Sequence, residues 1–429
     1  MAPPIDDPKY DIFYSENVDK DTSSSWDMIK PPQDSLNNKG NIRFIIDAST
    51  KYWMDLSHAY IDYEARIIHK DGTVPAATEE VAFINNAAHS IFSDFKLAIN
   101  ETIVAGGDGN YHFIAYFHNH LQYTNGMKST LKITEGYHSP SLDKADKDFE
   151  DWDHTTNAAL KTTMAEGKRI KLTLPLRTVC ILNQDKALPP GKSIAITLTR
   201  NDPKFAIWAK DKAKDYDFEI TNMNIVIPML HPSTSIQAQI AEKSRNTRAS
   251  FHYPNMRLFR YNIAKGTTEK DISNVFQNQC VRLAFFAFIP SANYNNQNIR
   301  KFLFHRHNLN QLELYTEGRS ISGKPLLVSD VSESYRHFNR QFNLYSANED
   351  IGINLDEFDN YSNIWPFDCT LGGNIDARQE SGGANQRPYD FKLKFSVPSK
   401  SLDILCFFVT DERFVLGPGN EVISADYAK

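Results

Sequence analysis

Two histidine pairs are the first residues in this chain whose type and spacing could support chemistry. His118 and His120 lie two apart in a stretch with strand character, so both imidazoles would share a face and could bind one metal ion. A cupin-type site would add a glutamate soon afterwards, but the next one is Glu135, beyond a glycine. We therefore interpret the pair as polar residues at a strand end. His305 and His307 repeat the spacing and receive the same interpretation.

An acidic run, Asp143–Asp153, could in principle supply carboxylates to a calcium ion. An EF-hand loop requires glycine at its sixth position and glutamate at its twelfth. Counting from Asp146, those positions hold Asp151 and Asn157. The run therefore predicts a solvated surface loop.

The glycine-rich segment Gly106–Gly109 resembles a phosphate-binding loop only in composition. It lacks the GK[ST] ending, and we expect no helix after it, so a tight β connection is the better interpretation. No GxSxG motif is present, and no pair of acidic residues stands out as a glycosidase pair. The sequence therefore predicts no enzyme, with no catalytic, cofactor-binding or metal-binding residue.

Composition narrows the class further. A chain of 429 residues is long enough for two domains, and its 27 Phe and 19 Tyr favour β packing. The net charge of −6 argues against a dedicated nucleic-acid binder. Four cysteines without CxxC spacing predict free thiols in a reducing compartment. We expect neither a signal peptide nor a membrane segment, because no apolar run is long enough.

Alternating hydrophobicity predicts strands along most of the chain. The clearest case is Phe391–Val397, where Phe391, Leu393, Phe395 and Val397 share one face. Val281–Ile289 is apolar on both faces, which is typical of a strand between two layers. Further strands are expected over Tyr60–Ile68, Phe92–Ile99, His112–Tyr123, Ile170–Leu176, Ile194–Leu198, Asp217–Ile227, Arg248–Ile263, Leu309–Ile321, Arg336–Tyr345 and Leu402–Thr410.

These strands fall into two stretches of similar size. We expect a polar tail over 1–40, a first jelly roll over 41–232, a second over 246–416 and a tail over 417–429, with one short helix at Ile236–Lys243. Two long excursions, Thr124–Glu166 and Ala347–Pro388, interrupt the domains. The fold class is therefore all-β, with two jelly-roll β-sandwiches in tandem and long loop insertions.

Four segments in order along the chain resemble the double jelly-roll major capsid proteins of the Maverick/Polinton and adintovirus group. They are YWMDLSHAYIDYEARIIHKDGT (Tyr52–Thr73), NNAAHSIFSDFKLAINETIV (Asn85–Val104), YHFIAYFHNHLQY (Tyr111–Tyr123) and IWPFDCT (Ile364–Thr370). The resemblance implies a homotrimeric, pseudo-hexagonal capsomer in an icosahedral shell around double-stranded DNA. It also implies neighbouring capsomers and penton or minor capsid proteins as partners, and a place in the virion capsid after assembly inside the host cell.

A homotrimer would bury lateral flanks and long loops that one subunit leaves exposed. Three loop aromatics, Trp152, Tyr361 and Trp365, are the candidate subunit interface, although each could instead cover its own domain. The alternative function is a jelly-roll carbohydrate- or receptor-binding protein, which long aromatic loops would serve equally well. Size in solution discriminates between the two, because a capsid subunit forms trimers or shells whereas a lectin binds glycans.

Overall fold

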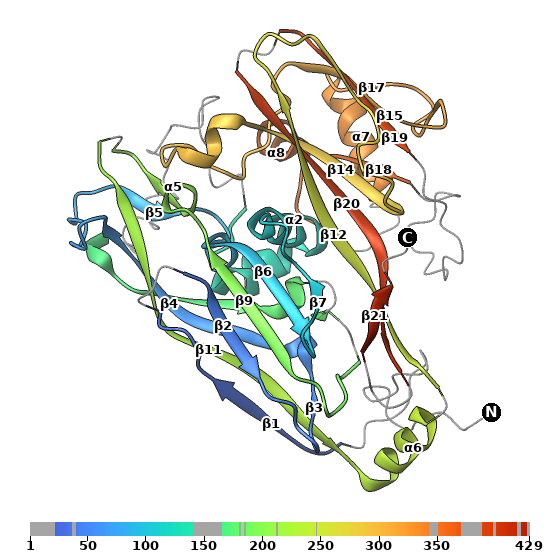
Figure 1. Cartoon of the computed structure of the whole chain (residues 1–429). Helices are drawn as coiled ribbons and strands as arrows, with labels where there is room; N and C mark the ends of the chain where they lie inside the picture. Colours follow the sequence, from blue (N-terminus) through green and yellow to red (C-terminus); the bar gives the residue numbers. More distant parts are fainter. Residues whose placement is uncertain are drawn as a thin grey trace.

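The computed structural model describes residues 22–36, 40–139, 165–179, 182–183, 186–211, 213–245, 247–342, 351–369, 388–397, 400–417 and 422–426. Strands dominate these residues, and they form two tandem β-sandwiches of jelly-roll type, as the sequence predicted. Figure 1 shows the first sandwich below and the second above it.

The strands of the first half are β1 (Thr22–Lys30), β2 (Ile42–Ile46), β3 (Trp53–Met54), β4 (Tyr60–His69), β5 (Val81–Phe83), β6 (Phe92–Ile99), β7 (Thr102–Ala105), β8 (Ile170–Pro175), β9 (Ile194–Arg200), β10 (Ile207–Ala209) and β11 (Tyr216–Pro232). One sheet has the order β1-β11-β4-β8, with β3 also paired to β11. The other has the order β2-β9-β6-β7, and β5 pairs with β10 separately. All these pairings are antiparallel.

The strands of the second half are β12 (Ala249–Ile263), β13 (Glu269–Ile272), β14 (Val281–Pro290), β15 (Leu309–Thr316), β16 (Arg319–Ser320), β17 (Leu326–Leu327), β18 (Trp365–Asp368), β19 (Tyr389–Phe395), β20 (Leu402–Leu416) and β21 (Val422–Asp426). One sheet has the order β12-β20-β14-β18, with β21 beside β20. The facing sheet has the order β13-β19-β15-β16, with β17 beside β15.

Short helices lie in the connections. They are α1 (Ala87–Ser90), α2 (Tyr111–Gln122), α3 (Asn125–Ser129), α5 (Pro203–Ala206), α6 (Thr234–Ser244), α7 (Val331–Gln341) and α8 (Leu355–Tyr361), with 3₁₀ turns η1 (Leu56–His58), η2 (Leu131–Glu135), η4 (Ala165–Gly167), η5 (Leu176–Thr178) and η7 (Ser291–Asn295). Among the described residues, none of the helices has the length and apolar character needed to cross a membrane.

The sheet that contains β14 and β20 is covered on both faces. Phe286 and Phe408 point into the core of the second sandwich. Phe285 and Phe407 point the other way, into a core that is continuous with the first sandwich. Successive side chains of a strand face opposite sides, so a sheet between two layers must be apolar on both. This confirms the expectation for Val281–Ile289.

Two expected strands are helices. The stretch predicted as a strand over His112–Tyr123 is α2, and that predicted over Arg336–Tyr345 is largely α7. Aromatic residues favour strands mainly because strands bury them, and α2 offers the same burial. In α7 the Asp330 side chain accepts a hydrogen bond from the Glu333 amide, which caps the helix N-terminus.

Both expected tails contain a strand. Within 1–40, β1 pairs antiparallel with β11, and within 417–429, β21 pairs with β20. An edge strand can be held by backbone hydrogen bonds to its neighbour even when its side chains are polar, so a polar composition did not exclude pairing. A smaller error concerns Val397, which is 63% exposed because β19 ends at Phe395.

Candidate functional site: the joint between the two long excursions

Helix α2 lies between the two sandwiches and is buried almost all round (Figure 1). On the side of the second sandwich, the Phe117 ring centroid is 3.8 Å from that of Phe407. Tyr116 stacks on Phe302 with centroids 4.2 Å apart and nearly parallel planes. On the side of the first sandwich, Tyr111 packs on Phe95 of β6. The helix therefore joins the two halves through a shared aromatic layer.

The two long excursions meet beside α2. We call residues 124–139 and 351–364 together the excursion joint. Lys128 of α3 donates a hydrogen bond through Nζ to the carbonyl of Ile351. The Ser139 hydroxyl donates to Glu357 Oε1 of α8 at 2.8 Å. The excursions are far apart in sequence, one from each sandwich, yet they form one surface unit.

His120 at the end of α2 holds both sides of the excursion joint. Its Nδ1 is 2.9 Å from the Tyr137 hydroxyl, and its Nε2 is 3.0 Å from the Ser362 hydroxyl. The imidazole is completely buried. Burial, together with the nearby Lys128 ammonium, holds the pKa of His120 well below its usual range. The ring is therefore neutral, with one nitrogen donating and the other accepting.

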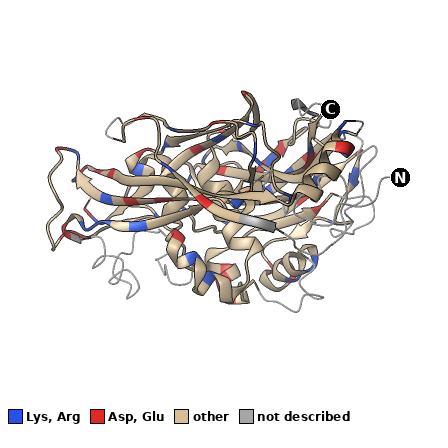
Figure 2. Ribbon diagram, turned by 90° about the horizontal axis from the view of Figure 1, so that it is seen from below, with Lys and Arg blue, Asp and Glu red and all other residues tan. Residues whose placement is uncertain are grey.

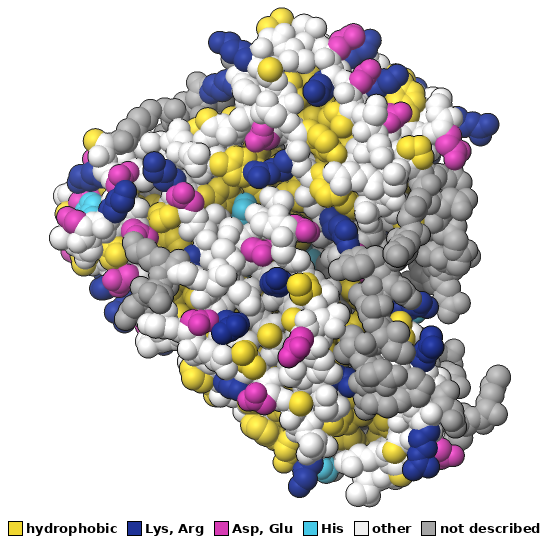
Figure 3. Space-filling view, viewed as in Figure 1, with side chains coloured by type: hydrophobic (Ala, Val, Ile, Leu, Met, Phe, Trp, Pro, Cys, Tyr) yellow, Lys and Arg dark blue, Asp and Glu magenta, His cyan; other side chains and the backbone are white. Residues whose placement is uncertain are grey.

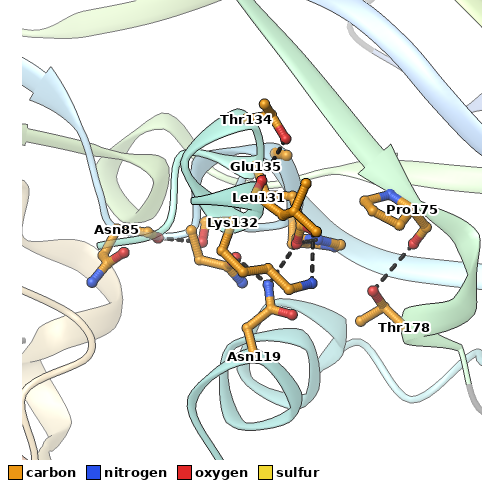
Figure 4. A network of polar contacts seen from close by, with 12 residues as sticks. Asn85, Asn119, Leu131, Lys132, Thr134, Glu135, Pro175 and Thr178 are labelled. Carbon is orange, nitrogen blue, oxygen red and sulfur yellow. Dashed lines mark hydrogen bonds and ion pairs between the residues drawn. The ribbon is translucent and has the colours of Figure 1, made fainter. Parts of the chain in front are cut away.

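A buried ion pair fixes the first excursion against α1 and α2 (Figure 4). Glu135 lies 2.7 Å from Lys132 Nζ, accepts from Asn119 Nδ2 at 2.7 Å and lies 3.1 Å from His89 Nε2. Burial opposes ionisation of Glu135, but hydrogen bonding and charge from His89 and Lys132 outweigh it and lower the pKa to about 2. The Tyr111 hydroxyl lies 2.8 Å from the other nitrogen of His89.

This network inverts the usual orientation of side chains on η2. Lys132 and Glu135 point into the protein, whereas Leu131 and Ile133 are 58% and 62% exposed. Leu355, at the start of α8 in the other excursion, is 44% exposed. Single exposed aliphatic residues are common on protein surfaces. Here, however, three lie on the excursion joint, and two of them are held outward by a buried ion pair.

Of the three aromatic residues predicted at the subunit interface, the structure describes Tyr361 and Trp365. Trp152 lies outside the described residues. Tyr361 is half-buried at the end of α8, within the excursion joint. Trp365 is fully buried inside the second sandwich, where its Nε1 donates to the Ser334 hydroxyl at 3.0 Å. Because it has no exposed surface, Trp365 cannot contact a neighbouring subunit, contrary to our expectation.

The two histidines of the first pair do not share a face. On a helix, residues two apart point about 200° apart, so His118 and His120 face different surroundings. His118 packs edge-on against Tyr123, while His120 faces the excursion joint. Among the described residues, no group of three or more His, Cys, Asp or Glu side chains could hold a metal ion. The acidic run Asp143–Asp153 lies outside those residues.

The glycine-rich turn binds one of the protein's own carboxylates. Asp94 Oδ1 accepts from the amides of Gly107 and Gly109 at 3.0 and 3.4 Å. Contrary to our expectation, a helix does follow, since α2 begins at Tyr111. A cavity of about 310 Å³ beside the turn is lined by both sandwiches. With an aspartate already on its amides, the turn is not arranged to bind phosphate.

Acidic and basic residues are mixed along the described part of the chain. Figure 2 shows acidic and basic residues interspersed along the ribbon rather than gathered on one face. In Figure 3, which has the viewpoint of Figure 1, hydrophobic side chains reach the surface in the upper central part of the molecule, among charged neighbours.

Cys280, Cys369 and Cys406 are free thiols. Cys180 lies outside the described residues.

Comparison with solved structures identifies the fold. The chain superposes on a chain of the Sputnik virophage structure with a TM-score of 0.62, at 13% identity over 96% of this chain and 89% of that one. The Faustovirus major capsid protein gives 0.58 at 9% identity, covering 94% and 92%. The mavirus major capsid protein gives 0.53 at 9% identity, covering 96% and 92%. The protein therefore has the double jelly-roll fold of viral major capsid proteins.

Sequence comparison adds one cellular relative. An uncharacterised protein of Caenorhabditis elegans is 21% identical over 317 residues, which cover 71% of this chain and 72% of that protein. No protein-family model matches the chain.

Proposed function

We propose that this chain is a major capsid protein, three copies of which form a pseudo-hexagonal capsomer of an icosahedral shell around double-stranded DNA. The observation that carries the proposal is the extent of the fold match. Both jelly rolls align in one superposition that spans nearly the whole of this chain and of the capsid proteins. Two sandwiches per subunit give a trimer six similar units, which is the arrangement a pseudo-hexagonal tile requires.

The excursion joint is the proposed contact between subunits. It presents Leu131, Ile133 and Leu355, which one subunit leaves exposed, and it includes Tyr361. Cyclic association would bury these side chains and would close without open-ended growth. We expect each interface to exceed roughly 2,000 Å², the range of obligate contacts. Trp152, which belongs to the first excursion, stays a candidate for the subunit contact.

Further parts of the proposal rest on the segments that resemble the Maverick/Polinton and adintovirus group. We propose that the protein belongs to the virion capsid, that it is assembled inside the host cell, and that its partners are neighbouring capsomers and penton or minor capsid proteins. The proposed role is structural and requires no catalysis, cofactor or metal. The mixed-sign surface supports shell contacts with other proteins rather than tight binding of DNA (Figure 2).

Light scattering of the purified full chain at micromolar concentration tests the proposal. We expect a trimer, and ring-shaped or pseudo-hexagonal particles in negative-stain images. A folded monomer would overturn the capsomer. Specific binding on a glycan array by such a monomer would instead favour the carbohydrate-binding alternative.

A pair of variants tests the proposed contact surface. Leu131→Ser combined with Ile133→Ser should dissociate the trimer, because both side chains are exposed in the isolated subunit and their replacement costs the fold little. Leu327→Ser is the matched control, since Leu327 is 45% exposed on β17 and belongs to neither segment of the excursion joint. If the double variant remained trimeric, the trimer would stand but the contact would lie elsewhere.

A further inference from the structure

The layer between the two sandwiches contains buried imidazoles that the proposed structural role does not use. His112, His118 and His120 lie on α2, and His89 lies on α1 beside it. All four are buried, and burial lowers the pKa of each. Only His120, among these four, has contacts to both excursions in the hydrogen bonds described above.

The contacts of His120 link three segments that are far apart in sequence. The ring belongs to α2, Tyr137 follows η2 in the first excursion, and Ser362 follows α8 in the second. The Tyr116 ring also stacks on the imidazole, with ring centroids 5.4 Å apart. The imidazole therefore contacts both excursions from the helix that joins the two sandwiches, and its bond to Ser362 ties the second excursion to α2.

We propose that His120 is a proton-sensitive clasp, and that protonation of its fully buried imidazole loosens the second excursion from α2. The clasp is a property of the subunit. Its consequence for assembly rests on the proposed function, because the loosened segment carries Leu355 of the proposed subunit contact.

The surroundings of His120 disfavour a positive charge. Lys128 of α3 is the charged group whose field acts on the ring, and it is itself buried against the Ile351 carbonyl. From its own helix and the first excursion His120 meets Tyr116 and Tyr137, which are neutral phenols. From the second excursion it meets the Ser362 hydroxyl. The carboxylate of that excursion, Glu357, accepts from Ser139 rather than from the imidazole. No carboxylate contacts the ring in the described hydrogen bonds.

The direction of the pH effect follows from linkage. In the closed joint the pKa of His120 lies well below 6.5, whereas in an open, hydrated joint it returns to about 6.5. Above that value both states are neutral and the closed joint is fully favoured. As pH falls below it, protons bind the open state first. The open-to-closed ratio therefore rises by up to about tenfold per pH unit until the folded pKa is reached.

Hydrogen exchange measured by mass spectrometry at a series of pH values tests the clasp. The full chain is examined from pH 7.5 down to pH 4.5, with exchange rates corrected for intrinsic pH dependence. Peptides from 351–364 should lose protection, while peptides from β14 and β20 stay protected. Peptides from 131–139 should also stay protected, because the Glu135 network holds them to α2 independently of His120. His120→Gln retains a donor and an acceptor but does not titrate in this range, so its joint should stay protected at pH values where the wild-type joint opens.

Two further variants control the experiment. His118→Gln changes a neighbouring buried imidazole that faces Lys132, Glu135 and His89 rather than Ser362, so the pH at which 351–364 opens should not change. Ser362→Ala removes one partner of the ring without altering a titrating group, and should move the opening to higher pH. If His120→Gln fails to fold, the Ser362→Ala shift still decides the matter.

Each other outcome counts against the clasp. Identical pH profiles for wild type and His120→Gln would overturn it, as would protection of 351–364 that persists until the sheets themselves unfold. The oligomeric state does not enter this measurement. A monomeric protein would therefore refute the capsomer while leaving the clasp testable, and a trimer without acid opening would refute the clasp alone.

Discussion

At the scale of single residues, the Lys132–Glu135 pair shows how a buried charge can orient a surface. Glu135→Gln should destabilise the fold by about 3–5 kcal/mol, because Lys132 would stay buried without its counter-charge. Adding Lys132→Met should recover much of that loss. Urea denaturation measures both. Glu269→Gln is the control, since its ion pair with Lys394 is exposed and should contribute less than about 1 kcal/mol.

The same carboxylate predicts an acid sensitivity of defined sign. The pKa of Glu135 is lowered from 4.5 to about 2 in the fold, so its contribution to stability is fully present above pH 4.5 and disappears as pH falls toward 2. Glu135→Gln should flatten this part of the stability curve relative to wild type. Equal curves for the two proteins over this range would contradict the assigned network.

Core truncations test the strand phases in each sandwich separately. Leu172→Ala and Phe395→Ala should each cost about 2–5 kcal/mol, because both side chains are almost fully buried. Val397→Ala, two residues beyond Phe395, should change the free energy of unfolding by less than about 0.5 kcal/mol, since Val397 is exposed. A large loss at Val397 would mean that β19 extends further than Phe395.

At the scale of elements, the pairing of β1 with β11 predicts that this part of the N-terminal segment stabilises the fold, which an unpaired polar tail would not do. Deleting residues 1–21 keeps β1 and its pairing with β11, so this truncation is the reference. Deleting 1–30 removes the pairing of β1 with β11 and the contact of Trp26 with Tyr52. The loss should be at least about 2 kcal/mol if a few ladder hydrogen bonds contribute roughly 0.5–1.5 kcal/mol each. Equal melting temperatures for the two truncations would show that β1 does not stabilise the sandwich.

Sequence patterns were sufficient to locate some strands but not the buried helix α2 or the excursion joint. Period-two alternation located strands such as β4 and β19, because each has one covered face. It failed for α2, where nearly every position is buried and no polar face remains to show the period. A helical signal was present in the spacing of Phe113, Tyr116, Phe117 and His120. The excursion joint could not be predicted, because its partners are more than two hundred residues apart.

At the scale of the whole molecule, the shared aromatic layer bears on how the two halves unfold. The face of the β12–β20–β14 sheet that carries Phe285 and Phe407 is covered by α2, which belongs to the first half of the chain. An isolated second half would expose that face of the sheet. An isolated first half would expose the side of α2 that packs against this face, where Phe117 lies. Exposed apolar surface of this kind makes a fragment aggregate or lose its packing.

We therefore expect the full chain to unfold in one cooperative transition, although it contains two sandwiches. Calorimetry and urea unfolding followed by far-UV and near-UV signals should give coincident curves. Phe117→Ala, at the centre of the layer, should destabilise both halves together by about 3–5 kcal/mol. Two separated transitions, with Phe117→Ala shifting only the first, would show that the sandwiches are independent domains. In that case α2 would be a linker that packs against the second sandwich without coupling its stability to the first.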